Sequence, residues 1–211
     1  MNYPVTIIDN FFADPDAVVK MASEFEYFED KSGAWPGKRT RSLFDLNEEF
    51  ARCFAEKLFT VFYRQVPDYI QLDLTFQIVN PFDESRNGGW IHADCPCHFG
   101  GIVYLTKDPD PDTGTSIYTP NNGYYAIKNE IKEMHYRGED IHSTLYETAY
   151  NHMKENFTET VNVSNVYNRL MMFDGATFHG VRTFGNKPRL TMPFFVRSNS
   201  DIAPLLRAPH V

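Results

Sequence analysis

The sequence predicts a mainly β fold: a jelly-roll barrel with helices before it and one helical insertion within it. Three observations lead to this prediction. Two amphipathic helical patterns come first, about seven short strand-like segments follow from residue 70, and a charged, helix-forming stretch at about 125–158 interrupts them. Helices followed by many short strands are typical of an antiparallel barrel supported by helices on its outside.

The first elements are a short strand, a helix and a loop. The strand is expected at residues 5–9. Asp14 followed by Pro15 predicts the start of a helix, because Asp is a preferred N-cap residue and Pro suits the first turn. We expect this helix to run to about Phe28. Residues 31–41, which combine polar and aromatic side chains, are expected to form a loop.

A second helix and then the barrel strands are predicted from apolar periodicity. The helix covers residues 48–63, and its apolar face is formed by Phe50, Phe54, Leu58 and either Val61 or Phe62. The strands are expected at residues 70–79, 101–106, 115–119, 160–163, 169–173 and 190–196. Each is short, apolar or β-branched and bounded by turn residues, which is the pattern of half-buried strands. Three histidines of the insertion are expected to be solvated: His135, His142 and His152.

The composition excludes two broad classes of partner. Hydrophobic residues make up 42% of the 211 residues, which is enough for a real core, and the formal net charge is −8. Nucleic acids and anionic membranes are usually met by clustered Lys and Arg, so we expect neither as a partner. The length is most simply one domain over residues 1–211. The composition does not predict an oligomeric state.

The N-terminus and the cysteines predict a cytoplasmic protein. The first residues lack the charged segment and long apolar stretch of a secretory signal, and no apolar run approaches the length of a transmembrane helix. The three cysteines are Cys53, Cys95 and Cys97. An odd number without a secretory signal suits a reducing compartment better than a disulfide framework.

A metal-ligand pattern is split across the chain as His92-Ala93-Asp94 and a distant His179. In a strand, residues i and i+2 project to the same side, so His92 and Asp94 can converge on one ion. His179 follows a strand that ends in a turn and can approach from a facing strand. Two imidazoles and one carboxylate are the facial triad of non-haem Fe(II) oxygenases, which leaves positions open for O2 and a cosubstrate. We therefore predict these three residues as metal ligands and as the catalytic centre.

Arg189 and Thr191 predict a site for the far end of such a cosubstrate. Arg189 lies 189 − 179 = 10 residues after His179, at the edge of an otherwise apolar stretch in which an arginine needs a partner. Its planar fork pairs with a carboxylate through two parallel hydrogen bonds. Thr191 lies on the same strand face. Arg182 is the weaker candidate for this role, because it sits in a turn before the strand.

Residues 90–94, 103–118 and 170–191 resemble the core of the 2-oxoglutarate- and Fe(II)-dependent oxygenases, particularly the prolyl-4-hydroxylase-like branch. The whole chain also resembles a small set of such proteins from bacteria and phages. The resemblance implies a double-stranded β-helix, which is a jelly-roll barrel. It also implies that His92, Asp94 and His179 bind Fe(II), and that Arg189 and Thr191 bind the C5 carboxylate of 2-oxoglutarate.

The sequence departs from that branch in two places. Gly114-Thr115-Ser116 stands where the branch often has Gly-Gly-Glu-Thr, and Arg189 stands where it often has Lys. These departures leave the iron ligands intact but argue against prolyl hydroxylation in particular. The carboxylate of Asp94 argues against the related halogenases, which lack this ligand.

The predicted function is therefore a dioxygenase that hydroxylates an unidentified small-molecule, amino-acid or peptide substrate and forms succinate and CO2.

Tyr104 is expected to hydrogen-bond the cosubstrate, with core packing as the alternative. Trp90 either walls the site or fills the barrel. The insertion and the loops at 31–41 and 83–89 either form a lid or pack outside the barrel.

Three alternatives stay open at this stage. Cys95-Pro96-Cys97-His98 offers ligands for zinc, although no second cysteine pair follows. The second alternative is a non-catalytic metal-binding jelly-roll module, such as a phage structural or binding protein. The third is a cupin-like metalloenzyme that does not use 2-oxoglutarate. Fold alone does not separate these possibilities.

Overall fold

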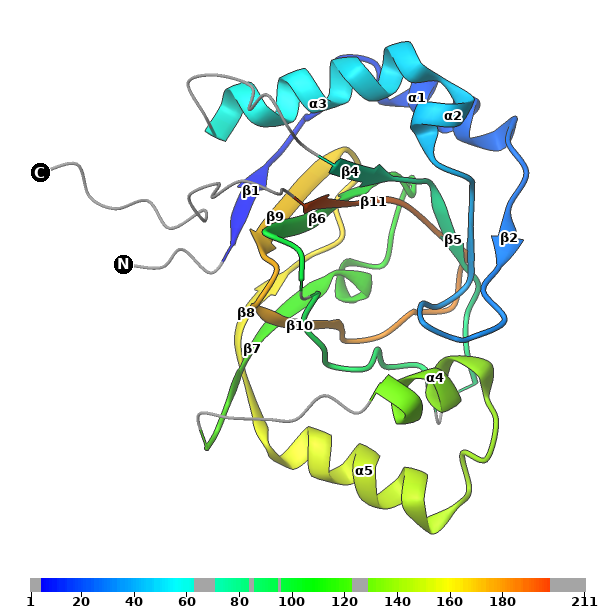
Figure 1. Ribbon diagram of the computed structural model, residues 1–211, viewed down its shortest axis with the longest axis vertical. Helices are drawn as coiled ribbons and strands as arrows, with labels where there is room; N and C mark the ends of the chain where they lie inside the picture. The colour runs from blue at the N-terminus through cyan, green and yellow to red at the C-terminus, as the bar shows by residue number, and fades with distance from the viewer. Residues whose placement is uncertain (1–4, 63–70, 84–85, 95, 123–128, 198–211) are drawn as a thin grey trace, which may run out of the picture.

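Two antiparallel sheets with helices on both sides form the fold, as the computed structural model shows for residues 5–62, 71–83, 86–94, 96–122 and 129–197. The larger sheet has the strand order β1-β9-β6-β11-β5-β3-β2, with β4 also paired to β11, and the smaller sheet has the order β10-β7-β8. Helices α1 to α3 lie along the larger sheet, and α4 and α5 lie on the opposite side of the molecule (Figure 1). The predicted jelly-roll class is confirmed.

The element bounds are as follows. The helices are α1 (Pro15–Ser23), α2 (Leu43–Leu46), α3 (Glu48–Phe62), α4 (Asn129–Arg137) and α5 (Thr144–Glu155). The strands of the larger sheet are β1 (Thr6–Ile8), β2 (Phe28–Glu29), β3 (Lys38–Arg39), β4 (Gln71–Leu74), β5 (Gln77–Val79), β6 (Phe99–Tyr104), β9 (Arg169–Asp174) and β11 (Arg189–Arg197). The strands of the smaller sheet are β7 (Thr115–Pro120), β8 (Phe157–Val163) and β10 (Phe178–Val181). No helix within these described residues is long and apolar enough to cross a membrane.

The first predicted helix begins where expected but ends early. Asp14 caps α1, since its Oδ1 accepts a hydrogen bond from the Ala17 backbone N–H at 3.0 Å. The prediction that this helix reaches Phe28 is wrong, because α1 ends at Ser23 and Phe28 lies in β2. Residues 24–29 alternate glutamate with aromatic side chains almost throughout, and aromatic residues favour extended strands over helices.

The second predicted helix is confirmed as α3, which covers the larger sheet. Its residues Phe54 and Phe59 make edge-to-face contacts with Phe194 and Phe99 of the sheet, with ring centroids 5.4 and 5.9 Å apart. Such pairs add to the free energy that burying the rings already contributes. The apolar face predicted from periodicity is therefore the face that packs on the barrel, while Val61 and Phe62 have side chains outside the described set.

The predicted strand at 70–79 is divided into β4 and β5. Both pair with β11, with Leu74 opposite Phe194 and Gln77 opposite Thr191. Between these pairs lies Pro193, which has no N–H to donate to the ladder, so the regular pairing is interrupted there. The other predicted barrel strands are confirmed, with ends that differ by a few residues.

The predicted helical insertion is confirmed as α4 and α5, although residues 123–128 at its start lie outside the described set. The prediction that His135 is solvated is wrong. Its side chain is fully buried, with Nε2 2.8 Å from the Gly88 carbonyl and Nδ1 2.6 Å from the Tyr146 hydroxyl. The ring also stacks on Tyr146 and Tyr150, so it joins α4, α5 and the segment that leads to Trp90. His142 and His152 are exposed, as predicted.

Candidate metal centre

His92 and His179 face each other across a two-residue antiparallel bridge. The His92 N–H donates to the His179 carbonyl at 3.0 Å, and the His179 N–H donates to the His92 carbonyl at 2.8 Å. His179 belongs to β10, whereas His92 makes only this isolated bridge. The expectation that His92 and Asp94 share a regular strand is therefore wrong. Asp94 lies in a loop, where its N–H donates to the Gly175 carbonyl at 2.8 Å.

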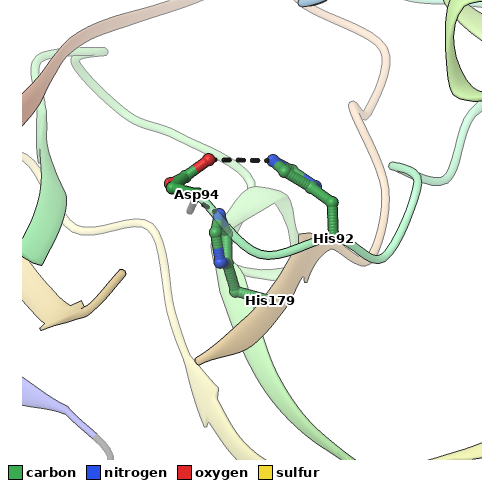
Figure 2. A group of neighbouring side chains, drawn as sticks. All are labelled: His92, Asp94 and His179. Carbon is green, nitrogen blue, oxygen red and sulfur yellow. Dashed lines mark ion pairs between the residues drawn. The ribbon is translucent and has the colours of Figure 1, made fainter. Parts of the chain in front are cut away.

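The three side chains nevertheless converge (Figure 2). Asp94 Oδ1 lies 3.6 Å from His92 Nε2, and Asp94 Oδ2 lies 3.3 Å from His179 Nε2. One donor atom from each residue lies within 4.8 Å of the others, close enough to hold one metal ion. Among the described residues, no other group of three or more His, Cys, Asp and Glu side chains brings its donor atoms this close together.

Both imidazoles are oriented by backbone carbonyls. His92 Nδ1 lies 2.8 Å from the Trp90 carbonyl, and His179 Nδ1 lies 3.0 Å from the Thr177 carbonyl. Because a carbonyl can only accept, each Nδ1 carries a proton, so Nε2, which faces Asp94, is the nitrogen of each ring that is free to bind a metal. This arrangement is typical of metal-binding histidines, whose second nitrogen is anchored by an acceptor.

Burial and mutual charge set the ionisation of the group. Burial, together with the nearby His179, lowers the pKa of His92 to about 4. Burial opposes ionisation of Asp94, but His179 and His92 outweigh it, so the pKa of Asp94 is lowered. Burial also opposes the charged form of His179, but its ion pair with Asp94 raises the pKa of His179. A neutral His92 and an ionised Asp94 are in the form that a metal requires, whereas the proton that Asp94 favours on His179 would be released when the metal binds.

Arg189 is a buried cation without an acidic partner among the described residues. Its side chain is 3% exposed, its Nε donates to the Thr113 carbonyl at 2.9 Å, and its Nη2 has no hydrogen-bond partner. The nearby hydroxyl of Thr191 is also buried and has no partner. Unsatisfied groups of this kind are costly and are uncommon in folded proteins. An incoming carboxylate would satisfy the guanidinium at Nη2.

Tyr104 lies against Arg189 rather than at the metal ligands. Its ring centroid is 5.4 Å from the guanidinium carbon, and its hydroxyl donates to Thr115 Oγ1 at 2.9 Å. The tyrosine is fully buried and does not line the cavity described below. Its position therefore holds the guanidinium in place.

One cavity of about 680 Å³ joins these features. The candidate metal ligands and Arg189 line it from the barrel side. Residues 34–40, which include strand β3 of the larger sheet, and helix α4 form its outer wall and contribute Trp35, Arg39, Lys132 and Tyr136. Its size lies within the range of small-molecule sites. Sequence reasoning identified the barrel side of this cavity but not Arg39 or Lys132, although it noted the unusual polar and aromatic composition of residues 31–41.

The remaining candidates lie elsewhere or only partly within the described residues. Arg182 is exposed and lies near Asp112 and Glu159, at 3.5 and 3.4 Å. Cys97 lines the cavity but is not part of the ligand group, and Cys95 lies outside the described residues. Trp90 is fully buried against His135, Tyr146 and Tyr150, so it fills the space beneath the insertion and does not line the cavity.

Residues 1–183 match the model of DUF6445, a family of unknown function. The chain belongs to this family. No curated protein matches it in sequence. The family itself assigns no activity, so what the molecule does has to be argued from its site.

Solved structures are similar to this chain at low sequence identity. The epimerase SnoN, in complex with Fe³⁺, alpha ketoglutarate and nogalamycin RO, is 12% identical with a TM-score of 0.61, and the match covers 99% of this chain and 86% of SnoN. HygX from Streptomyces hygroscopicus, with nickel, 2-oxoglutarate and hygromycin B bound, is 13% identical with a TM-score of 0.60 and covers 94% and 84%. A prolyl hydroxylase from Trichoplax adhaerens is 12% identical with a TM-score of 0.56 and covers 92% and 84%. The chain therefore has the fold of the 2-oxoglutarate-dependent oxygenases.

Proposed function

We propose that this protein is an Fe(II)- and 2-oxoglutarate-dependent dioxygenase that hydroxylates a small-molecule, amino-acid or peptide substrate. The observation that carries this proposal is the pairing of two features in one cavity. A group of two imidazoles and one carboxylate lines the same cavity as a buried guanidinium that has a free donor. A metal ion alone would need the first feature but not the second.

The donor set fits Fe(II). Nitrogen ligands from His92 and His179 and an oxygen ligand from Asp94 match the 2-His-1-carboxylate triad, and the group contains no thiolate of the kind common in structural zinc sites. The anchored Nδ1 atoms keep both rings in the ligand orientation. His92, Asp94 and His179 would therefore hold the iron.

Arg189 and Thr191 would hold the distal carboxylate of 2-oxoglutarate. The guanidinium Nη2 and the threonine hydroxyl are buried donors that lack partners. Tyr104 and the Thr113 carbonyl fix the rest of the guanidinium, so little conformational entropy is lost when the acid binds. When bound, iron and 2-oxoglutarate together supply the oxidising chemistry that consumes O2 and yields succinate, CO2 and an oxygenated product.

The structural neighbours support a substrate of modest size. HygX has been solved with hygromycin B, and the Trichoplax adhaerens hydroxylase with a peptide fragment. A cavity of about 680 Å³ has room for a cosubstrate and part of such a molecule. SnoN is described as an epimerase, so a fold of this kind does not by itself fix the outcome of the reaction.

The test is an anaerobic titration of the Fe(II)–2-oxoglutarate charge-transfer band. Arg189→Ala should keep the iron but weaken 2-oxoglutarate binding by roughly 30-fold or more, because a lost charge-assisted contact in a buried site costs about 2–5 kcal/mol. Arg189→Lys should be intermediate, since it keeps the charge but loses the fork. The control is Arg182→Ala, whose exposed side chain should not matter.

Each rival function gives a different result in the same assay. A cupin-like metalloenzyme would bind iron but show no band. A non-catalytic module would bind iron without accumulating succinate above a His179→Ala control in the presence of O2 and 2-oxoglutarate. If Arg189→Ala binds 2-oxoglutarate as the wild type does, the proposed carboxylate site is wrong.

A further inference from the structure

The outer wall of the cavity carries two cations that have no acidic partner within ion-pair distance among the described residues. Arg39 and Lys132 both line the cavity, and neither takes part in an ion pair within the ranges that the structure describes. The Nε of Arg39 is buried and has no hydrogen-bond partner. Buried or half-buried cations are normally paired, so these two need an explanation.

Arg39 is held rigidly and points inward. It belongs to β3, where it pairs with Gln77 of β5, and its neighbour Lys38 is exposed and forms an ion pair with Glu29 at 3.0 Å. Successive residues of a strand project to opposite faces, so Arg39 faces the cavity side. Its guanidinium carbon lies 4.6 Å from the Trp35 ring centroid and 5.6 Å from that of Phe195. Burial lowers the pKa of Arg39 to about 10, so it is still charged at neutral pH.

The loop before β3 packs closely against helix α4, which carries Lys132. Gly33 has a φ of +77°, and an added Cβ would lie 2.6 Å from the Glu133 carbonyl oxygen of α4. Arg137 of α4 donates to the Ser32 carbonyl of the loop. This close approach places Lys132, the neighbour of Glu133, and Arg39 at the same end of the cavity, and the positive charge of Arg39 helps to lower the pKa of Lys132, although burial is the larger cause.

The acids that act electrostatically on Arg39 and Lys132, Asp94 first among them, have other partners. Asp73 forms an ion pair with Arg197 at 3.3 Å, and Glu133 lies 3.8 Å from Arg137. Each of these acids therefore has its own arginine. Neither neutralises Arg39 or Lys132 at ion-pair distance.

Binding of the cofactors would not neutralise the two cations either. Asp94 and one carboxylate of 2-oxoglutarate would together balance the charge of Fe(II), and Arg189 would balance the other carboxylate. Arg39 and Lys132 would then remain as two positive charges lining the cavity of a chain whose net charge is −8. An anion at this place would gain strong, charge-assisted hydrogen bonds.

We propose that Arg39 and Lys132 form a subsite for an anionic group of the substrate, a carboxylate or a phosphate, and that Trp35 packs beside the part of the substrate that carries it. The proposal rests on the proposed oxygenase function, because it defines which substrates that site accepts. Arg39 provides a planar fork fixed between two rings, and Lys132 provides a second, flexible donor. Arg39 lies on the same sheet as Arg189, two strands away across β5, so the subsite adjoins the cosubstrate contact but uses different side chains.

The experiment uses matched pairs of charged and neutral ligands. The probes are 3-phenylpropionate with 3-phenylpropionamide, hexanoate with hexanamide, and phenyl phosphate with phenol. Binding is measured by ligand-observed NMR on protein loaded with 2-oxoglutarate and Zn(II), which is diamagnetic and prevents turnover. We expect the anions to bind about tenfold or more tightly than their neutral partners. The carboxylate and phosphate arms show which anion is preferred.

Variants then locate the effect. Arg39→Gln and Lys132→Gln should each remove most of the preference for anions while leaving the 2-oxoglutarate affinity within about twofold of wild type. Lys38→Gln is the matched control, because it removes an exposed charge from the neighbouring position of β3. Because the two variants lie on different elements, misfolding of one still leaves the other as a test. Thermal unfolding of each variant is compared with that of wild type.

Several results would overturn the proposal. They are equal binding of charged and neutral probes, no detectable binder in the panel, or a preference for anions that survives both variants. A loss of 2-oxoglutarate binding in Arg39→Gln as large as in Arg189→Ala would make Arg39 a cosubstrate contact instead. If wild type itself shows no Fe(II)–2-oxoglutarate band, the oxygenase function fails, and the same ligand pairs measured on metal-free protein still test the anion subsite separately.

Discussion

The two walls of the cavity are built in different ways. The barrel wall is formed by both sheets: Arg189 lies on β11 and His179 on β10, and their registers are fixed by ladders with β5 and β7. On the outer wall, Arg39 comes from β3, a two-residue strand near the edge of the larger sheet, and Lys132 comes from helix α4, which contacts the loop before β3. A strand register follows from local sequence pattern, whereas docking of distant segments does not. In our proposals the barrel wall binds the metal and the cosubstrate, and the outer wall selects the substrate.

The largest expected effect is the loss of Fe(II) binding on the barrel wall. His92→Ala, Asp94→Ala and His179→Ala should each abolish Fe(II) binding, which in wild type should approach one ion per chain, because a facial triad has no spare protein ligand. Metal analysis after anaerobic reconstitution measures this. The control is Cys97→Ser combined with Cys95→Ser, which should retain the iron. If the double cysteine variant loses the metal and His179→Ala keeps it, the zinc interpretation is correct and the triad is not.

The next effect concerns His135, which joins the outer wall to the segment before His92. Burial lowers the pKa of His135 to about 4, below its ordinary value of 6.5. The unfolded chain therefore binds more protons between these two values, and the stability contributed by the neutral side chain is present above pH 6.5 and is lost as the pH falls towards 4. A shift of this size corresponds to roughly 3 kcal/mol.

The measurement is urea unfolding of metal-free protein between pH 4 and pH 7.5. His135→Gln should be less stable than wild type near neutral pH, and the difference should shrink as the pH falls below 6.5. His92 titrates in the same direction, but it is present in both proteins, so the difference isolates His135. A difference that stays constant across this range would contradict the argument.

A smaller effect tests whether the two walls act independently. Gly37 has a φ of +71°, and an added Cβ would lie 2.2 Å from the Ile78 carbonyl oxygen. Gly37→Ala should therefore displace β3 from β5 and cost at least about 1–3 kcal/mol, the range for a non-glycine residue forced into a strained backbone conformation. Binding of 3-phenylpropionate should weaken, while the Fe(II)–2-oxoglutarate band should persist.

Lys38→Ala is the control for that experiment, since it alters an exposed side chain next to the same strand. Thermal unfolding and the two binding assays are measured on both variants. Loss of the charge-transfer band in Gly37→Ala would show that the walls are not independent. In that case the separation of chemistry from selection would have to be abandoned.

The same contrast explains how much the sequence could predict. The barrel class, the start of α1 and the helix α3 followed from periodicity and capping, because these depend on residues close together in the chain. The convergence of His92, Asp94 and His179 was expected for a partly wrong reason. Asp94 is placed by its hydrogen bond to the Gly175 carbonyl, a partner 175 − 94 = 81 residues away, and not by strand alternation.

The outer wall had almost no local signal. Lys132 looks like any charged residue of an amphipathic helix, and His135 looks like a solvated one. Both are placed by contacts to segments far away in the sequence, such as the Gly88 carbonyl for His135 and loop 31–37 for α4. The early end of α1 shows the same limit, because a helical start predicts little about where the chain turns back into a strand.

The smallest expected effect compares one buried hydroxyl from each wall. Thr191 on the barrel wall and Thr40 on the outer wall are both buried, but only the Thr40 hydroxyl is bonded, donating to the Arg41 carbonyl at 2.8 Å and accepting from the Phe76 N–H at 3.1 Å. The Thr191 hydroxyl has no partner. Thr191→Val removes an unsatisfied group and keeps the shape, so stability should stay the same or rise.

The cost of Thr191→Val should appear only when the cosubstrate binds. If the hydroxyl donates to the distal carboxylate of 2-oxoglutarate, its loss should weaken binding by roughly 2- to 10-fold, which corresponds to about 0.5–1.5 kcal/mol. Thr40→Val should give the opposite pattern: lower stability, because its partners are left unpaired, and unchanged 2-oxoglutarate affinity. Thermal unfolding and the charge-transfer titration measure both quantities. If Thr191→Val destabilises the protein as much as Thr40→Val and leaves 2-oxoglutarate binding unchanged, Thr191 is a structural residue and the carboxylate is held by Arg189 without it.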